Sequence, residues 1–368
     1  MRVLMTTDTV GGVWTFTAEL SRELLASGCA VALVSLGRIP TSSQLDWVAA
    51  QVSRWGSKFR FAACDAPLEW MQDNWGAMSE AEPLLKRIVR EFCPDILLSS
   101  QFCLGALKGT MPRIVVAHSD VLSWAKACRS GSLPSSDWLD RYNRLVQDGL
   151  READAVVAPT RWMLDALAAN YQLPEETYVI PNGRTIDSPS RIPSCYMQAI
   201  TAGRLWDEGK NLKMLSDVKS PIPILVAGET EHEMSYMEES CGQARLLGRL
   251  TEEELLEVMR QSAVYICTSS YEPFGLAPLE AALCGCAVVA NDIPSLREVW
   301  SDAALYFKDS ASLSSLLAAL AADGGLLARA RARSRRRAQQ FTARKMAKSY
   351  LHLLLSVSQP VLAEHSVA

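Results

Sequence analysis

Short apolar segments alternate with segments of helical composition along most of the chain, and this alternation constrains the fold more than any other feature of the sequence. In the first half, the segments that predict strands are residues 2–5, 31–35, 59–63, 96–99, 113–117, 155–158 and 178–180. Segments with a helical pattern lie between them, at residues 13–25, 138–152 and 160–170. Strands that alternate with helices in this way predict an α/β fold, in which helices cover both faces of a parallel sheet.

A second series of the same kind follows a polar segment rich in Ser and Pro at residues 184–196, which predicts a linker. Its predicted strands are residues 198–202, 222–227, 245–247, 264–267, 287–290 and 304–307, and its clearest helix is residues 252–260. We therefore predict two doubly wound parallel-sheet domains, of residues 1–185 and 196–340, joined by a linker of residues 186–195. In such an arrangement, ligands bind between the domains, outside the carboxyl ends of the strands.

The C-terminal segment, residues 312–356, has a helical pattern with breaks at Gly324-Gly325 and near Phe341. We expect residues 341–358 to form a last helix and residues 359–368 to be a loose tail. Six arginines lie from Arg329 to Arg337. We interpret them as a solvated helix face, in preference to a patch that binds a membrane or a polyanion.

The composition is that of a globular protein without a nucleic-acid partner. The 37 lysines and arginines are balanced by 41 acidic residues, and a net charge of −4 provides no field that would attract a polyanion. No apolar segment approaches the ~20 residues needed to cross a bilayer, and residues 1–5 are too short for the apolar part of a signal peptide. The ten cysteines form no Cys-x-x-Cys pair. We therefore expect a cytoplasmic protein with reduced thiols, and nothing indicates peripheral membrane contact.

One candidate site surrounds Glu272 and Glu280, which lie eight residues apart. The apolar segment 263–267 before them predicts a buried strand, and the segment 276–283 predicts a helix. The Pro-Phe-Gly between the two predicts a tight turn, with the N–H groups of the helix N-terminus open to anions and sugar hydroxyls. Two carboxylates that face one crevice in this way accept hydrogen bonds from vicinal hydroxyls, such as those of a ribose or a hexose.

A second candidate site follows the first strand of the second domain, at Gly203-Arg204 and Lys210. A strand, a glycine turn and a helix form a geometry that receives a phosphate. Arg204 provides a planar set of donors and Lys210 a point charge, and together they can neutralise a diphosphate leaving group. In the alternative, Arg204 pairs with Glu208 on the surface, and Lys210 pairs with Asp207. The chain contains no Asp-x-Asp, the usual seat of a divalent metal beside a diphosphate, so we expect no metal and no cofactor.

The first domain contributes three further candidates. Gly11-Gly12 follows the first strand but does not complete a dinucleotide-binding fingerprint, and a structural role in a tight turn is the alternative. His118 comes directly after the strand at residues 113–117, at the edge of the sheet where ligands bind, although a purely structural histidine is the alternative. Asp120 lies two residues further on, where it could orient His118 or meet an acceptor.

The stretch from Tyr271 to Glu280 resembles the Glu-x7-Glu signature of the retaining glycosyltransferases of family 4, whose fold is the two-domain GT-B type. The stretch from Gly203 to Asn211 is similar to the Gly-Arg-Leu…Glu-x-Lys-Asn pattern of that family. The resemblance implies two Rossmann-like domains that face each other across a cleft, with the acceptor on the first and the donor nucleotide on the second. It also implies that the last helix crosses back to the first domain.

The resemblance implies a role for each motif position. The positions for the donor sugar and its ribose are Glu272, the backbone of Phe274, Gly275 and Leu276, and Glu280. The positions for the diphosphate are Gly203, Arg204 and Lys210. The first domain would approach the donor with Gly11, Gly12 and His118, the last of these against the 6-hydroxyl of the hexose. We take Arg204, Lys210, Glu272 and His118 as the catalytic set. Further contacts would come from Arg249 at the nucleotide base and from Asp120 and Trp14 on the acceptor side.

Two of these placements have structural alternatives. An exposed loop arginine explains Arg249 nearly as well as stacking on a base does. The Asn182-Gly183-Arg184 turn resembles the turn of the family at the seam between the domains, and hinge structure explains it as well as ligand contact does.

The activity that the resemblance implies is transfer of a hexose from a nucleoside diphosphate sugar, of the UDP-glucose or GDP-mannose type, to a hydroxyl of a saccharide, lipid or small molecule. Configuration would be retained by a front-face displacement, in which the leaving phosphate deprotonates the acceptor. One alternative is a hydrolase with Glu272 and Glu280 as acid and nucleophile, although it has no use for Arg204. A nucleotide-sugar epimerase and a non-catalytic nucleotide-binding subunit are the others.

Overall fold

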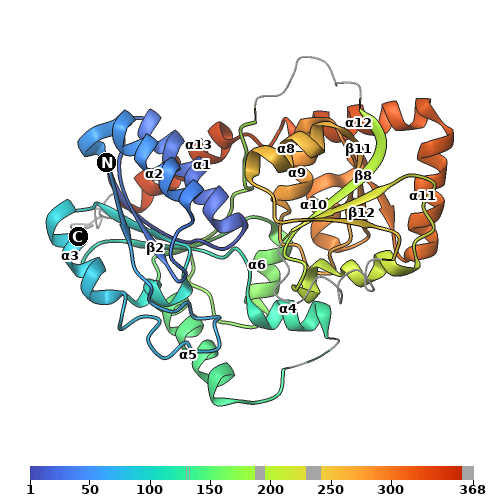
Figure 1. Ribbon diagram of the computed structural model, residues 1–368. Helices are drawn as coiled ribbons and strands as arrows, with labels where there is room; N and C mark the ends of the chain where they lie inside the picture. The colour runs from blue at the N-terminus through green and yellow to red at the C-terminus, as the bar shows by residue number, and fades with distance from the viewer. Residues whose placement is uncertain (130, 132, 187–194, 229–241, 359–368) are drawn as a thin grey trace, which may run out of the picture.

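The computed structural model of the protein describes residues 1–129, 131, 133–186, 195–228 and 242–358, which form two lobes, each built on a parallel sheet (Figure 1). The first sheet consists of β1 (Arg2–Asp8), β2 (Ala30–Leu36), β3 (Phe59–Ala63), β4 (Ile96–Ser99), β5 (Arg113–Val116), β6 (Ala155–Ala158) and β7 (Thr177–Val179). The second consists of β8 (Tyr196–Ala202), β9 (Ile224–Ala227), β10 (Arg245–Gly248), β11 (Ser262–Cys267), β12 (Ala287–Asn291) and β13 (Leu305–Phe307). These strands overlap the predicted apolar segments, and the predicted α/β class is confirmed.

Helices connect the strands and cover the sheets. Those up to β7 are α1 (Gly12–Ala26), α2 (Ser42–Trp55), α3 (Glu82–Phe92), α4 (Val121–Cys128), α5 (Asp137–Glu152) and α6 (Arg161–Ala168). Those after β10 are α8 (Glu252–Arg260), α9 (Leu276–Cys284), α10 (Pro294–Trp300), α11 (Ser310–Ala322), α12 (Gly324–Ala338) and α13 (Ala343–Ser358). Among the described helices, none is by itself long and apolar enough to cross a membrane; segments 310–322 and 324–358 pass such a test only as a pair bent by 109°.

Both sheets have a doubly wound strand order. The first runs β3-β2-β1-β4-β5-β6-β7 and the second β10-β9-β8-β11-β12-β13, with all neighbouring strands parallel. The order reverses between β1 and β4 in the first sheet and between β8 and β11 in the second. Chain segments leave these neighbouring strands toward opposite faces, so a crevice opens at their carboxyl ends. A ligand site is therefore expected at the loops that follow these four strands.

The last helix, α13, packs on the first domain although it follows the second domain in sequence (Figure 1). Its apolar side chains Met346, Tyr350 and Leu354 lie in the same core cluster as the buried residues of α1. The chain crosses near Gly183, where an added Cβ would lie only 2.3 Å from the carbonyl oxygen of Thr342. Because only glycine fits this contact, the turn at the seam has a structural role.

The arginine cluster on α12 is not simply a solvated face. The Nε of Arg331 donates to the carbonyl oxygen of Gly285 at 2.6 Å, at the end of α9. The Nε of Arg337 donates to the carbonyl oxygen of Val299 at 2.6 Å, near the end of α10. Cations in these positions stabilise the carbonyl ends of helices. The prediction is therefore correct only for part of the cluster, such as the exposed Arg329.

The predicted secondary structure differs from the structure in several places. The helices α2 and α3 were not predicted, although Thr41 and Gln44 form a capping box at the start of α2. The helix predicted after Gly203 is wrong: the chain forms two short 3₁₀ helices, η3 (Glu208–Lys210) and η4 (Leu212–Asp217). Asn211 between them has a left-handed conformation, with φ 49°, which interrupts a regular helix. The predicted linker and the tail at residues 359–368 lie almost entirely outside the described residues.

Candidate active site

A cleft of about 1390 Å³ lies between the two domains. The loops that follow β1, β4, β8 and β11 all line it, as the strand order requires. The predicted site residues that line the cleft are Gly11, Gly12, His118, Asp120, Gly203, Arg204, Lys210, Glu272, Phe274, Gly275, Leu276 and Glu280. The fold therefore brings motifs from both halves of the chain to one place.

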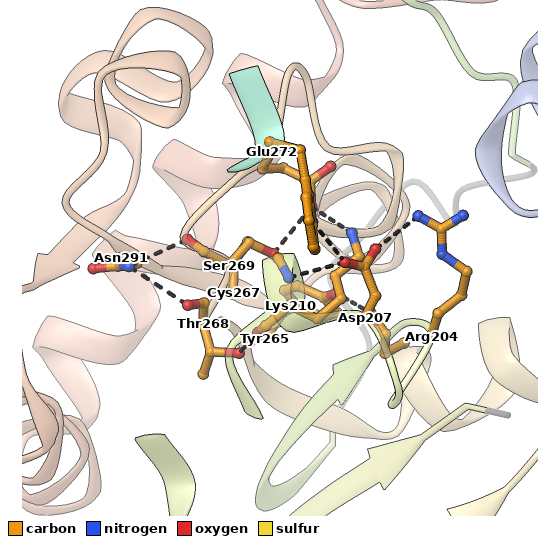
Figure 2. Close-up of polar contacts among 12 residues, drawn as sticks. Arg204, Asp207, Lys210, Tyr265, Cys267, Thr268, Ser269, Glu272 and Asn291 are labelled. Atoms are coloured by element: carbon orange, nitrogen blue, oxygen red, sulfur yellow. Dashed lines mark hydrogen bonds and ion pairs between the residues drawn. The ribbon is translucent and has the colours of Figure 1, made fainter. Parts of the chain in front are cut away.

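Lys210 and Glu272 form an ion pair in the half of the cleft that belongs to the second domain (Figure 2). The Nζ of Lys210 lies 2.7 Å from Oε2 of Glu272, and Oγ of Ser269 donates to the same oxygen at 3.1 Å. Burial disfavours the lysine charge, but the carboxylate of Glu272 outweighs burial, so the pKa of Lys210 lies above its ordinary value. Lys210 therefore carries a positive charge in the cleft at neutral pH.

The ends of β11 and β12 hold this ion pair in place. The hydroxyl of Thr268 donates to the carbonyl oxygen of Lys210 at 2.6 Å. The amide of Asn291, at the end of β12, donates to the carbonyl oxygens of Thr268 and Ser269 at 3.5 and 3.2 Å (Figure 2). Lys210 and Glu272 are thus positioned by strands rather than by exposed loops, which favours a fixed geometry.

Arg204 is held by Asp207, with Nη2 2.7 Å from Oδ2 (Figure 2). The other carboxylate oxygen of Asp207 accepts a hydrogen bond at 3.2 Å from Nε1 of Trp124, on α4 of the first domain. Burial alone would raise the pKa of Asp207, but the charges of Arg204 and Lys210 lower it below its ordinary value. Asp207 is therefore an ionised carboxylate that links the arginine to the opposite domain.

The alternative pairing of Arg204 with Glu208 and of Lys210 with Asp207 does not occur. Glu208 pairs with Arg129 of the first domain, whose Nε and Nη2 lie 2.9 and 2.7 Å from the two carboxylate oxygens. Asp207 pairs with Arg204, and not with Lys210. The loop from Gly203 to Lys210 is thus connected to the first domain through α4 and the residue that follows it.

The N-terminus of α9 faces the cleft without a side-chain cap. Gly275 precedes the helix with φ 91°, a conformation that favours glycine. Phe274 is buried and packs edge-on against Phe341, with ring centroids 5.5 Å apart. Because no side chain among the described residues caps the first N–H groups of α9, they can donate to an anion or to hydroxyl oxygens.

The glycine pair of the first domain approaches this site from the opposite side of the cleft. An added Cβ on Gly12 would lie 3.3 Å from Cδ1 of Leu276, and one on Gly11 would lie 3.9 Å from Nη1 of Arg204. Gly11 also has a positive φ of 68° at the start of α1. The two glycines therefore let the loop after β1 lie against the motifs of the second domain.

Glu280 lines the cleft and is bound by Arg184 from the seam between the domains. The Nε of Arg184 donates to Oε1 of Glu280 at 2.8 Å, and its two other nitrogens bind Glu19 of α1 and Glu252 of α8. The Arg184 side chain is only 7% exposed, and that of Glu19 only 2%. Burial raises the pKa of Glu280, and the charge of Arg184 opposes this rise. Arg184 therefore connects both domains to the carboxylate that the resemblance assigns to the ribose.

His118 lies in the cleft as a neutral imidazole. Its Nε2 is 3.2 Å from Oγ of Ser100, and its ring packs edge-on against Phe16 with centroids 4.6 Å apart. Burial lowers the pKa of His118 to about 4. At neutral pH it can therefore exchange hydrogen bonds with a ligand, but it adds no positive charge.

Asp120 does not orient His118, so that prediction is wrong. Its Oδ1 accepts hydrogen bonds from the N–H groups of Leu122 and Ser123 at 2.9 and 3.1 Å, which makes Asp120 the N-cap of α4. Its Oδ2 is buried and has no partner among the described residues. Since Asp120 lines the cleft, its other predicted role, contact with an acceptor, fits this placement.

Two predicted residues do not line the cleft. Trp14, on α1, is half-buried and packs edge-on against Trp47 and Phe61 beside the core cluster of the first domain, so its placement does not support the predicted contact with an acceptor. Arg249 is exposed and outside the cleft lining, where its neighbour Leu250 lies instead. Neither position could be decided from local sequence, because it depends on the direction of a side chain within the fold.

Two buried carboxyl groups of the cleft, Asp8 and Glu69, were not predicted from the sequence. Asp8 ends β1 and accepts from the N–H of Val10 at 2.8 Å; burial raises its pKa to about 7, although Val10 and the charge of Arg204 oppose the rise. Glu69 accepts from the N–H of Phe102 at 2.8 Å, and burial raises its pKa as well. The position of Asp8 at the carboxyl end of a strand was an available signal, whereas Glu69 lies in an irregular segment without such a signal.

The described residues offer no obvious metal site. No group of three or more His, Cys, Asp or Glu within them is placed to hold a metal ion. All the cysteines within the described ranges are free thiols. The fixed positive charges that the cleft presents beside Glu272 are those of Arg204 and Lys210.

Two family models match consecutive parts of the chain, one for each domain. The model described as Glycosyltransferase Family 4 matches residues 10–188, and the model described as Glycosyl transferases group 1 matches residues 200–339. The chain belongs to glycosyltransferase family 4.

Curated relatives match this family 4 glycosyltransferase over part of their length. Alpha-maltose-1-phosphate synthase of Mycobacterium tuberculosis is 26% identical over 234 residues, which cover 54% of this chain and 58% of that enzyme. The match thus spans less than two thirds of such relatives. The tRNA-queuosine alpha-mannosyltransferase of Drosophila melanogaster is 29% identical over 113 residues, which cover 27% of this chain and 30% of that enzyme.

Solved structures show that this family 4 glycosyltransferase has the predicted GT-B fold. Sucrose-phosphate synthase of Thermosynechococcus elongatus superposes with a TM-score of 0.76 at 16% identity, over 97% of this chain and 99% of that chain. The Anabaena protein HepE, in complex with UDP and glucose, superposes with a TM-score of 0.72 at 17% identity, over 97% of this chain and all of that chain (100%).

Proposed function

We propose that the protein transfers a hexose from a nucleoside diphosphate sugar to an acceptor hydroxyl, with retention of configuration. One observation carries this proposal: Arg204, Lys210 and Glu272 line the same cleft. The uncapped N-terminus of α9 faces that cleft as well. Two fixed cations and a helix N-terminus favour a diphosphate. The carboxylate beside them favours the hydroxyls of the attached sugar.

The chemistry of this reaction suits the charges of the site. As the bond from C1 of the hexose to the leaving phosphate breaks, negative charge grows on the diphosphate, where Arg204 and Lys210 stabilise it. The acceptor oxygen forms its bond to C1 on the same face, and its proton passes to the leaving phosphate. No enzymic nucleophile and no divalent metal are required, so catalysis depends on charge stabilisation and positioning.

The Lys210–Glu272 ion pair suggests how donor binding prepares the site. The diphosphate competes with Glu272 for the ammonium of Lys210, which lies 2.7 Å from the carboxylate. When Lys210 turns to the diphosphate, Glu272 gains an oxygen for the sugar hydroxyls. His118 accepts or donates one further hydrogen bond from the first domain, and Glu280 meets the ribose.

The relatives support this choice of substrates. Their names describe an alpha-maltose-1-phosphate synthase and mannosyltransferases, and the structural neighbour HepE holds UDP and glucose. We therefore propose a donor of the UDP-glucose or GDP-mannose type and a saccharide acceptor. We also propose a cytoplasmic location, because the thiols of the described cysteines are free.

A hydrolase that uses Glu272 and Glu280 as its two carboxylates is the second candidate. The structure favours it less, because each carboxylate is bound by its own cation, Lys210 in one case and Arg184 in the other. A retaining hydrolase needs one of the two as a free nucleophile and the other as a protonated acid. An epimerase or a non-catalytic subunit would share the nucleotide site, and these are separated by product analysis.

The test begins with thermal unfolding in the presence of UDP, GDP or ADP. One nucleoside diphosphate should raise the melting temperature, since ligand at ~100 times its Kd adds about 2.7 kcal/mol of stability. The matching hexose donor should then be consumed in the presence of an acceptor, with full activity in EDTA and with the anomeric configuration kept in the product. If no nucleotide raises the melting temperature, the proposal is wrong; a strict need for a metal would overturn its metal-independent part.

A further inference from the structure

The acceptor face, by which we mean the cleft-lining residues of the first domain, carries a pronounced excess of acidic side chains. Six carboxyl groups lie on it: Asp8, Asp65, Glu69, Asp73, Glu80 and Asp120. Its two arginines among the described residues are Arg38 and Arg129. A cleft with one dominant sign of charge concentrates its field on whatever enters it.

One of the two arginines, Arg129, forms an ion pair with the opposite domain. Arg129 forms a bidentate pair with Glu208, with contacts of 2.9 and 2.7 Å, and also lies over the ring of Trp124 at 5.0 Å. Its charge is therefore balanced within the protein. The acceptor face does not repeat the arrangement of the donor site, where Arg204 and Lys210 stand together.

The deepest carboxyl groups of this face resist a further negative charge. Asp8 and Glu69 are 7% and 3% exposed, and the charge of Glu69 adds to the effect of burial on Asp8. The nearby His118 is neutral, so it offers no compensating cation. A phosphate group, which carries about −1.5 to −2 charges near neutral pH, would raise the pKa of these buried carboxyl groups further and would find no compensating cation in His118.

A second observation shows that this face is built to receive a ligand. Asp120 is 2% exposed and lines the cleft, and its buried Oδ2 has no partner among the described residues. A buried carboxylate oxygen without a donor is costly, unless a ligand supplies the donor. A hydroxyl group is such a donor, whereas an ionised phosphate has only acceptor oxygens.

Aromatic rings complete the face. Trp70, Trp124, Phe102 and Trp138 all line the cleft. The ring of Trp138 stacks on Tyr142 with centroids 6.0 Å apart, and its Nε1 donates to the carbonyl oxygen of Met71 at 2.6 Å. Rings that are fixed in this way offer flat apolar surfaces to the C–H face of a sugar, while the carboxyl groups accept from its hydroxyls.

We infer that the acceptor is an uncharged saccharide, and that sugar phosphates are excluded from the acceptor face. The inference rests on the proposed function, since it names the second substrate of the same cleft. Recognition would come from hydroxyls that donate to Asp120 and its acidic neighbours, and from C–H contacts with the tryptophans. Exclusion would come from the excess of acidic groups on this face, a repulsive element that acts against a charged acceptor.

The test compares matched acceptors on the full chain. With the donor found by thermal unfolding, nucleoside diphosphate release is measured with glucose against glucose 1-phosphate, fructose against fructose 6-phosphate, and trehalose against its 6-phosphate. The uncharged member of at least one pair should accelerate release and should exceed its phosphate at least tenfold in kcat/KM. A sugar phosphate that exceeds its uncharged partner overturns the inference, and so does a panel of uncharged hexoses and disaccharides without any effect.

Charge reversal on the exposed part of the acceptor face provides a second, independent test of the inference. Asp65 and Asp73 are exposed and line the cleft, so the double variant D65K/D73K should fold. It should raise kcat/KM for the sugar phosphates at least tenfold relative to the uncharged sugars, and added salt should reduce the gain. An unchanged ratio would count against the inference. Stabilisation by a nucleotide distinguishes failure of the proposed function from failure of this inference. If no nucleotide stabilises the protein, the proposed function is wrong; if one does, the acceptor assays test only the class of the acceptor.

Discussion

The Nε of Arg184 donates to Oε1 of Glu280 at 2.8 Å, which joins the turn between the domains to the carboxylate assigned to the ribose. The same guanidinium binds Glu19 on the first domain and Glu252 on the second. One buried cation therefore binds three carboxylates from both domains. Opening of the cleft would separate Glu19 from Glu252, so Arg184 couples the state of the donor site to the relative position of the domains.

We expect Arg184→Ala to cost about 3–5 kcal/mol of unfolding free energy, because it leaves Glu280 buried without its counter-charge and leaves the buried Glu19 with Arg22 alone. It should also raise KM for the donor, since Glu280 loses the contact that orients it. Urea unfolding and initial rates measure the two effects. Arg151→Ala is the matched control: Arg151 is 60% exposed and pairs with Asp148, so the change should cost about 0–1 kcal/mol. Equal losses in both variants would contradict the assignment.

Lys210→Ala should lower kcat ~100-fold or more, because the charge that stabilises the leaving diphosphate is lost. The neighbouring Lys213 is exposed and outside the cleft lining, so Lys213→Ala provides the control and should keep full activity. Steady-state rates at saturating donor measure the difference. Activity retained in Lys210→Ala would remove this residue from the mechanism.

Trp124→Phe removes the hydrogen bond of 3.2 Å to Asp207 but keeps an aromatic ring on α4. The loss of one such bond, about 1 kcal/mol, should lower kcat ~5-fold through a less well-fixed Arg204. The melting temperature should change little. Trp75→Phe changes an exposed tryptophan outside the cleft lining and should have no effect on kcat. A fall in KM with unchanged kcat in Trp124→Phe would contradict the positioning role.

The low pKa of His118 makes stability depend on pH. Burial holds the folded-state pKa at about 4, below the ordinary 6.5, so the unfolded chain takes up a proton first as pH falls. Between these two values the wild type should lose up to about 3 kcal/mol relative to His118→Asn. Urea unfolding at both ends of this window measures the difference. His352→Asn, at an exposed histidine of α13, should track the wild type, and a parallel response of all three proteins would contradict the prediction.

Gly183→Ala should destabilise the protein by about 1–3 kcal/mol, because its Cβ would lie 2.3 Å from the carbonyl oxygen of Thr342. The backbone must shift, which loosens α13 on the first domain. Gly324→Ala is the control, since no atom lies within 4 Å of the added Cβ, and it should stay within about 0.5 kcal/mol. Thermal unfolding compares the stability of the two variants. Equal stability would show that the seam is not tightly packed.

The sequence by itself determined the order of strands and helices and the places of the principal motifs. The alternation of apolar strands with helices is local in the chain, and strand order then places the loops after β1, β4, β8 and β11 on the same cleft. Glu272, Glu280, Arg204 and Lys210 were recognisable because each belongs to a short motif in the segment that follows a strand, β11 for the two glutamates and β8 for the two cations. For these residues, the position in the local sequence was enough to place them in the cleft.

Only the tertiary structure decided which charges meet and which side chains face the cleft. Asp207 rather than Glu208 binds Arg204, and Arg184 binds Glu280, through contacts that depend on how the domains pack. Trp14, predicted to meet an acceptor, packs against Trp47 and Phe61 and does not line the cleft. A charge finds its partner within a few ångströms in space, and segments far apart in the chain reach that distance only after both sheets have formed and docked.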